Sequence, residues 1–170
     1  KRINEKTGLP KDVALRLPKE FHEAGVPSIE LTGGGEPLVY PYIVEFLDEL
    51  GNYPIELSIV TQGASMSEKI QERIKNLKWI RFSVDAMTPE THSKVHRVPS
   101  SVFNVVIRNI KALVNRQIKD CKIGISMVVT KNNYMEMEKA APFFMDMGVD
   151  NIRYTFVYDP QGDGAMSPDQ

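Results

Sequence analysis

Gly33-Gly34-Gly35-Glu36-Pro37 is the most informative stretch of this sequence. The preceding residues Ser28–Thr32 alternate apolar and polar side chains, which predicts a short β-strand. Pro41 and the apolar periodicity that follows it predict a helix, because proline is tolerated in a first helical turn. The sequence therefore places a triple-glycine turn between a strand and a helix.

The chemistry of this turn favours a ligand with an amino group. Glycines at the carboxyl end of a strand let the backbone turn sharply and approach a ligand, because no Cβ intervenes. Glu36 attracts a cation or an amine and repels a phosphate, and no Lys-Ser or Lys-Thr pair follows, as a phosphate loop would require. The alternative is that the glycines form a turn without a ligand.

Composition limits the classes of protein. The 170 residues suffice for one domain, and a net charge of −1 with scattered basic residues excludes an electrostatic surface for nucleic acid. The single cysteine, Cys121, excludes an internal disulfide, and His22, His92 and His96 lack ligand spacing, so no metal site is expected from these residues. No apolar run approaches the ~18 residues of a transmembrane helix, and the amino end lacks a signal-peptide core. We therefore expect a cytoplasmic protein with no membrane partner.

A unit of strand, loop and helix recurs along the chain. The predicted strands are Ser28–Thr32, Ile55–Thr61, Trp79–Asp85, Lys122–Thr130 and Asn151–Val157. The predicted helices are about Lys11–Ala24, a segment after Pro41, segments from Ser65 and Thr88, Phe103–Val114, and a segment from Asn133 towards Gly148. Strands separated by helices at this spacing indicate right-handed crossovers and a parallel sheet.

Local signals predict several helix ends. Ser65 and Glu68 predict a capping box that starts a helix. The apolar face of that helix comprises Met66, Ile70, Ile74 and Leu77. Thr88-Pro89-Glu90 predicts a cap, a first-turn proline and an acid near the helix dipole. Pro18 and Pro142 lie inside predicted helices and are expected to kink or shorten them.

The predicted strands also alternate in polarity, although parallel strands between helices are commonly apolar on both faces. The apolar face comprises Ile29, Leu31, Phe82, Val84, Ile123, Ile125, Met127, Val129, Ile152, Tyr154 and Phe156. A polar opposite face is costly when dry and unpaired, so we expect an open, hydrated concavity that holds a ligand. The alternative is that Glu30, Glu56, Arg81 and Arg153 pair with one another at its floor, and we expect both to be partly true.

Polar residues gather at the carboxyl ends of the strands, where ligands bind in such folds. Ser83 and Asp85 are two residues apart and share a face, so their hydroxyl and carboxylate suit a ribose diol. The alternative for Asp85 is a turn cap. The ends of two other strands carry Thr61, Gln62 and Gly63, and Thr130, Asn132 and Asn133.

These motifs resemble the radical S-adenosylmethionine (SAM) superfamily, from about Leu9 to Tyr158. The stretch Gly33–Pro37 matches the family's glycine-glycine-glutamate-proline motif, which implies that it holds the amino group of SAM. Ser83-Val84-Asp85 matches the family's ribose motif, and Thr61-Gln62-Gly63 resembles its Thr-Asn-Gly turn, with Gln in place of Asn. Looser matches imply that Arg97 binds the SAM carboxylate and that Val129 and Asn132 line the adenine pocket. The candidate SAM-binding residues are Gly33, Gly34, Gly35, Glu36, Pro37, Thr61, Gln62, Ser83, Asp85, Arg97, Val129 and Asn132.

The resemblance implies an α/β fold, an open partial (β/α)6 TIM-like barrel of parallel strands whose first strand is missing from this chain. It places this truncated barrel at residues 1–158 and a tail or connector at residues 159–170. The family's three-cysteine loop is absent, so we expect the ligands of its [4Fe-4S] cluster upstream of Lys1.

The resemblance also implies an activity for the intact protein. One electron, from a donor of the flavodoxin or ferredoxin type, cleaves SAM to methionine and a 5′-deoxyadenosyl radical, which abstracts hydrogen from an unknown substrate. The protein binds, orients and shields the reactants. Two alternatives stay open: a non-catalytic or degenerate barrel used for binding, and an ordinary β/α-barrel metabolic enzyme. No catalytic residue is identified.

Overall fold

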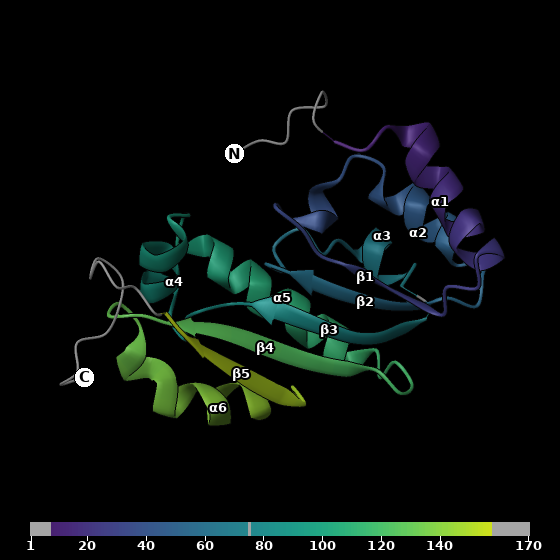
Figure 1. Ribbon diagram of the computed structural model, residues 1–170. Coiled ribbons are helices and arrows are strands. Elements are labelled where there is room, and N and C mark those ends of the chain that lie inside the picture. Colours follow the sequence, from purple (N-terminus) through teal and green to yellow (C-terminus); the bar gives the residue numbers. More distant parts are fainter. Residues whose placement is uncertain (1–7, 75, 158–170) are drawn as a thin grey trace. The chain divides into compact units, whose positions relative to one another are not determined.

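The computed structural model describes residues 8–74 and 76–157 of the chain. The predicted connector at 159–170 and the start of the predicted barrel at residue 1 lie outside these residues. In the described part, five strands form one sheet in the order β1-β2-β3-β4-β5 (Figure 1). The strands are β1 Ser28–Leu31, β2 Glu56–Thr61, β3 Leu77–Ser83, β4 Lys122–Val129 and β5 Asn151–Phe156.

Helices connect successive strands, as the sequence predicts. They are α1 Lys11–Glu23, η1 Pro37–Val39, α2 Ile43–Leu50, α3 Glu68–Gln71, α4 Pro89–His96, α5 Ser101–Asn115, η2 Tyr134–Glu136 and α6 Met137–Met145. The chain divides into two compact units, one of Lys1–Thr61 with Ser65–Ile80 and one of Gln62–Ala64 with Arg81–Gln170. Strand β3 begins in the first unit and ends in the second.

The first unit has its core between the β1–β2 pair and the helices α1 and α2. β1 pairs with β2 in parallel, with Ile29 opposite Leu57 and Leu31 opposite Ile59. The helices α1 and α2 contact each other, and in Figure 1 they lie together beside this strand pair. Leu47, Leu57 and Ile59 are almost fully buried.

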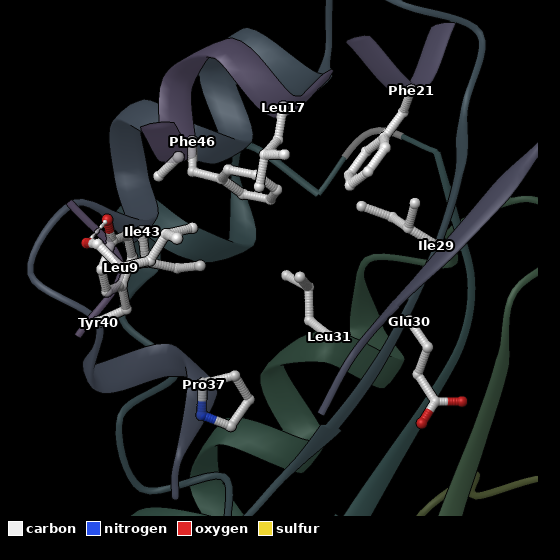
Figure 2. A pocket seen from close by; sticks show the side chains of 11 residues that line it. Leu9, Leu17, Phe21, Ile29, Glu30, Leu31, Pro37, Tyr40, Ile43 and Phe46 are labelled. Carbon is white, nitrogen blue, oxygen red and sulfur yellow. Dashed lines mark hydrogen bonds between the residues drawn. The ribbon is translucent and has the colours of Figure 1, made fainter. Parts of the chain in front are cut away.

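An apolar cavity of about 450 Å³ lies in the first unit, among α1, α2 and β1. Figure 2 shows Leu17 and Phe21 of α1 and Ile29 and Leu31 of β1 around it, whereas the carboxylate of Glu30 points away. β1 is the edge of the sheet in the described part of the chain, because it pairs with β2 alone. The cavity therefore lies beside the free edge of this strand.

The predicted capping box at Ser65 is wrong. Helix α3 is a single turn, and its N-cap is Ser67, whose Oγ accepts a hydrogen bond from the Ile70 N–H over 3.3 Å. The predicted helix face cannot extend to Leu77 because that residue already starts β3. Apolar spacing over so short a segment did not distinguish a helix from the loop that leads into a strand.

The second unit is built around β4 and β5, which pair in parallel with Ile125 opposite Ile152. Its core contains Phe82, Ile110, Ile125 and Phe144, each fully buried. The N-cap at Thr88 is confirmed, because its hydroxyl accepts a hydrogen bond from the Thr91 N–H over 3.2 Å.

Two further predictions about helices need correction. The helix expected from Asn133 begins as the 3₁₀ turn η2, and α6 ends at Met145, before Gly148. Gly148 has φ +90°, and a Cβ there would lie 2.7 Å from Val114 Cγ1, so glycine is required by both backbone and packing. Helix α1 spans nearly the predicted range and continues through Pro18, so that proline does not shorten it.

The predicted alternation of strand faces holds best in β4. Ile123, Ile125, Met127 and Val129 are buried there, but Phe156 of β5 is 56% exposed. Glu56, expected to pair with arginines on the polar face, instead forms an ion pair with Lys78 over 3.3 Å. None of the helices in the described ranges is both long and apolar enough to cross a membrane.

Candidate functional site

The glycine loop after β1 is open in the first unit. A Cβ placed on Gly33 or Gly34 meets no other atom within 4 Å, and neither glycine has a left-handed backbone. Packing and backbone conformation among the described residues therefore do not require glycine at these two positions. A ligand that contacts the backbone closely would require it, because a side chain would occupy the ligand's place.

Glu36, at the end of this loop, is held in a fixed orientation. Its Oε1 accepts a hydrogen bond from the Leu38 N–H over 3.1 Å, which caps η1, and one from the Thr61 hydroxyl over 2.6 Å. Thr61 ends β2 and is only 2% exposed. The structure thus brings together two predicted site residues from the carboxyl ends of adjacent parallel strands. A carboxylate fixed beside an open backbone suits an ammonium group.

The turn after Thr61 contains a glycine of a different kind. Gly63, in the second unit, has φ +82°, and a Cβ there would lie 2.6 Å from Phe82 Cδ1. The side-chain amide of Asn109 donates to the Gly63 carbonyl over 2.8 Å. This glycine is therefore required by the fold itself, while Gln62 beside it is exposed.

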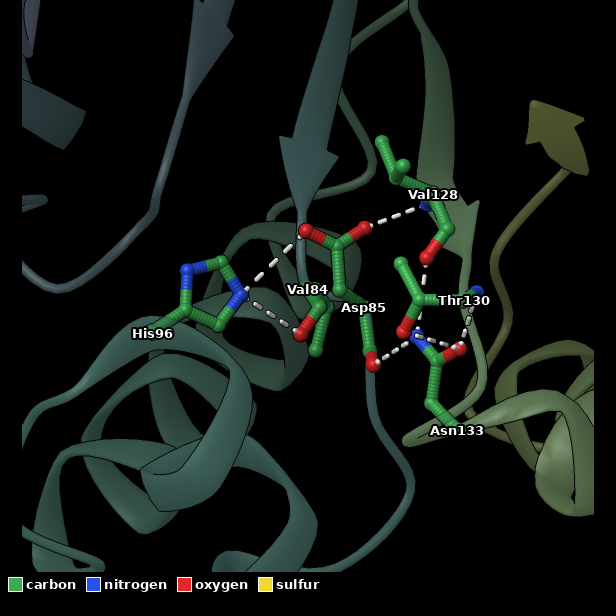
Figure 3. Close-up of polar contacts among 6 residues, drawn as sticks. All are labelled: Val84, Asp85, His96, Val128, Thr130 and Asn133. Atoms are coloured by element: carbon green, nitrogen blue, oxygen red, sulfur yellow. Dashed lines mark hydrogen bonds and ion pairs between the residues drawn. The ribbon is translucent and has the colours of Figure 1, made fainter. Parts of the chain in front are cut away.

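Asp85 lies just beyond β3, because its left-handed backbone (φ +52°) ends the predicted strand two residues early. Its Oδ1 accepts a hydrogen bond from the Val128 N–H over 2.5 Å, and its Oδ2 lies 3.4 Å from His96 Nε2 (Figure 3). Burial raises the pKa of the Asp85 carboxyl, partly offset by the hydrogen bond from Val128. Asp85 therefore has a structural role in the second unit, and its contact with a ribose stays a prediction. Ser83, at the end of β3, is half-buried.

His96 of α4 lies next to this carboxylate and His92 packs against His96, and sequence reasoning had set both histidines aside. His96 Nε2 lies 3.2 Å from the Val84 carbonyl as well as near Asp85, and both neighbours are acceptors, so Nε2 carries the proton. The His92 ring packs 4.5 Å from the His96 ring, and burial with the nearby His96 lowers the pKa of His92 to about 4. Their four-residue spacing on one helix face was the available signal.

Asn133 and Glu136 were also missed as site residues. The Asn133 side chain is buried and donates to the carbonyls of Asp85 and Val128, each over 2.8 Å, while its oxygen accepts from the Thr130 N–H over 2.7 Å (Figure 3). Glu136 accepts from the Met87 N–H over 2.6 Å. No short sequence pattern marks a buried polar residue whose hydrogen-bond partners lie far away in the sequence.

The remaining predicted residues are placed as follows. Arg97 is exposed and ends α4 with a left-handed backbone. Val129 is 1% exposed, so its side chain belongs to the core of the second unit. Asn132 is exposed, and its N–H donates to the Thr130 hydroxyl over 3.2 Å. Cys121 is half-buried, and burial raises its pKa to about 11, which keeps the thiol protonated and unreactive.

Residues 2–144 match the model of the Radical SAM superfamily. The chain belongs to the radical SAM superfamily. Membership implies SAM and a [4Fe-4S] cluster as cofactors. The cluster is held by several cysteine thiolates. This chain contains one cysteine, Cys121, and its raised pKa keeps the thiol protonated, so this chain does not supply those ligands.

Curated relatives are similar over part of their length. The GTP 3′,8-cyclase of Clostridium perfringens is 28% identical over 113 residues, which cover 61% of this chain and 35% of that protein. The S-adenosylmethionine-dependent nucleotide dehydratase of Flammeovirga pacifica is 28% identical over 141 residues, or 79% of this chain and 46% of that protein. The chain thus spans less than half the length of these relatives.

A solved structure has the same fold. SuiB of Streptococcus suis, crystallised with S-adenosylmethionine bound, superposes with a TM-score of 0.74 at 18% identity, covering 98% of this chain and 38% of SuiB. The predicted fold class, an α/β partial barrel of parallel strands, is confirmed.

Proposed function

We propose that this chain is the SAM-binding core of a radical SAM enzyme that, in the intact protein, cleaves SAM reductively to a 5′-deoxyadenosyl radical for hydrogen abstraction. The observation that carries the proposal is the orientation of Glu36 beside Gly33 and Gly34. When bound through cysteines of the intact protein, the [4Fe-4S] cluster supplies the electron for this cleavage. The work of the present residues is to bind and orient SAM.

In the first unit, Glu36 accepts hydrogen bonds from the ammonium group of SAM, while Gly33, Gly34 and Gly35 leave room for the ligand against the backbone. Pro37 starts η1, whose Leu38 N–H fixes the carboxylate. Thr61 adds a second fixed donor. Because both donors reach the same oxygen, Glu36 is oriented before SAM arrives, which lowers the entropic cost of binding.

In the second unit, Ser83 and Asp85 recognise the ribose hydroxyls. Ser83 is the last residue of β3 and is half-buried, so its hydroxyl stands at the carboxyl end of the strand, where ligands bind in parallel α/β folds. Arg97, exposed at the end of α4, pairs with the SAM carboxylate. Gln62, Asn132 and the backbone at Val129 contribute to the adenine side.

The proposal includes an electron donor and a cellular location. A reductant is required, and a small electron carrier of the flavodoxin or ferredoxin type fits that need. The reducing cytoplasm fits both the carrier and an oxygen-sensitive cluster.

Residues 1–158 form the barrel part and 159–170 a connector. The substrate reaches the carboxyl ends of the strands, where ligands bind in parallel α/β folds.

Gly34→Val tests the proposal in the intact gene product, purified and reconstituted with iron and sulfide without oxygen. The branched side chain fills the space that the ligand needs, so SAM affinity is expected to fall below detection in a calorimetric titration. Stability should stay near that of the parent, because nothing lies within 4 Å of the new Cβ. The control is Lys111→Val, an exposed change on α5, which should leave affinity unchanged.

Three other results would contradict the proposal. Unchanged SAM affinity in Gly34→Val would show that the glycine loop is no binding site. A parent protein that binds SAM but carries no iron and cleaves nothing would be a non-catalytic binding barrel. A parent that binds neither SAM nor iron would favour an ordinary metabolic enzyme.

A further inference from the structure

The segment between β3 and α4 is held by side chains from another part of the second unit. Residues 85–88 connect Asp85, beyond the end of β3, to Thr88, the cap of α4. Asp85 has a left-handed backbone, which is unfavourable for a residue with a side chain and persists only when neighbours hold it. The loop therefore depends on its contacts.

Asn133 holds the first residue of this loop. Its Nδ2 donates to the Asp85 carbonyl and to the Val128 carbonyl, each over 2.8 Å, and the residue is 2% exposed. Its Oδ1 accepts from the Thr130 N–H over 2.7 Å, so the amide is fixed in one orientation. The Asn133 amide thus links the Asp85 carbonyl to the Val128 carbonyl of β4 (Figure 3).

Glu136 holds the other end of the loop. Its Oε2 accepts from the Met87 N–H over 2.6 Å. Its Oε1 accepts from the hydroxyls of Thr91 over 2.6 Å and Thr88 over 3.2 Å. One carboxylate therefore fixes the last loop residues and the first turn of α4.

The geometry of η2 explains why two residues can act together. Asn133 is the N-cap of this 3₁₀ turn and Glu136 is its last residue. Side chains three residues apart on a 3₁₀ helix are eclipsed, so both leave the turn on the same side. The turn η2 thus contacts both ends of loop 85–88 at once.

We propose that η2 is a clamp that fixes loop 85–88 in the conformation that binds the ribose of SAM, with Asn133 and Glu136 as positioning residues. The inference rests on the proposed function, because it assigns the loop to SAM. Neither residue touches SAM in this account. They act by holding Asp85, and through it the end of β3 at Ser83, before the ligand binds.

Asn133→Asp and Glu136→Ala test the clamp in the reconstituted holoprotein. Asn133→Asp keeps the size of the side chain but turns an oxygen towards two carbonyls, and Glu136→Ala removes all three of its contacts. Each is expected to raise the Kd for SAM about tenfold, the effect of losing a buried hydrogen bond. Glu136→Gln keeps one acceptor oxygen for the Met87 N–H and turns an amide donor towards the threonine hydroxyls, whose oxygens can accept, so it should restore most of the affinity.

Combining each variant with Ser83→Ala distinguishes action through the ribose contact from a purely structural role. If the clamp acts through the ribose contact, the two losses in affinity overlap and the double variant is little weaker than the weaker single variant. All titrations are run at a temperature at which circular dichroism shows every variant folded. The matched control is Glu138→Ala, an exposed glutamate of α6 two residues from Glu136.

The outcomes are distinguishable. SAM affinity within twofold of the parent in both folded clamp variants overturns the clamp and leaves the proposed function intact. Full additivity with Ser83→Ala also overturns it. If Asn133→Asp does not fold, the clamp is tested by the two variants of the half-buried Glu136, Glu136→Ala and Glu136→Gln. A parent that binds no SAM overturns the proposed function, and the clamp with it.

Discussion

The hydroxyl of Thr61 donates to Glu36 Oε1 over 2.6 Å, although the two residues are 25 positions apart. This contact joins the carboxyl end of β2 to the loop after β1, so the parallel pairing of the two strands sets the orientation of the Glu36 carboxylate. It also explains why the strand that follows the glycine loop ends in threonine.

Thr61→Val is expected to weaken SAM binding about five- to tenfold, because valine has the shape of threonine but removes one of the donors that orient Glu36. Calorimetric titration of the reconstituted protein measures the effect. Thr61→Ser keeps the hydroxyl and should bind within about twofold of the parent. Equal losses in both variants would show that packing of the methyl group, and not the hydrogen bond, matters.

Gly63→Ala should destabilise the protein by about 1–3 kcal/mol, because the new Cβ meets Phe82 and the left-handed backbone disfavours alanine. Gly34→Ala should change stability by less than about 0.5 kcal/mol, since its Cβ would be in open space. Urea denaturation followed by circular dichroism measures both. The reverse ranking would mean that the glycine loop after β1 is the structural turn.

Asp85→Ala is expected to affect both stability and ligand binding. Leaving the Val128 N–H without its acceptor should cost about 1–3 kcal/mol of folding free energy, and loss of the ribose contact should weaken SAM binding by about 1.5–3 kcal/mol. Thermal melting and SAM titration are measured on the same sample. Lower stability with unchanged affinity would leave Asp85 as a turn cap only.

His92 should make folding stability fall in mild acid. Its pKa is lowered to about 4 in the folded protein, so between about pH 6.5 and 4 the unfolded chain binds a proton that the folded chain does not. The free energy of unfolding therefore falls as pH drops through this window, by at most about 3 kcal/mol, and is unaffected above it.

The nearby carboxyl of Asp85 acts in the opposite direction, because its raised pKa lets the folded protein bind its proton first. The comparison of parent and His92→Gln isolates the histidine. Melting temperatures at pH 5 and pH 7.5 should differ less in the variant than in the parent. An equal difference in both proteins would assign the acid sensitivity to other groups.

In the described part of the chain β1 is an edge strand, which predicts self-association of this chain when it is expressed by itself. Unpaired strand edges recruit other strands, and here an apolar cavity lies beside the edge. Light scattering after size exclusion should show species larger than a monomer, and Leu31→Lys should reduce them. The exposed change Val39→Lys is the control, and an equal effect of both variants would implicate general solubility.

Local patterns in the amino-acid sequence are enough to predict most helices and strands and their order. The alternation in Ser28–Thr32, the glycines that follow it and the cap at Thr88 act over a few residues, so periodicity and turn chemistry were enough to predict five strands. Where the local signal was short, as at Ser65, the prediction failed because the adjoining strand decided where the helix ended.

The pairing of the polar groups in the site depends on the tertiary fold. The Asp85 carboxylate accepts a hydrogen bond from the N–H of Val128, 43 residues away. The Asn133 amide donates one to the Asp85 carbonyl, 48 residues away. Such contacts depend on the register of parallel strands and on the direction in which a 3₁₀ turn points its side chains, and neither is encoded in any short segment. The partners of Asp85, Asn133 and Glu136 could therefore be found only once the strands were paired, since burial without those partners would be too costly for the fold to keep.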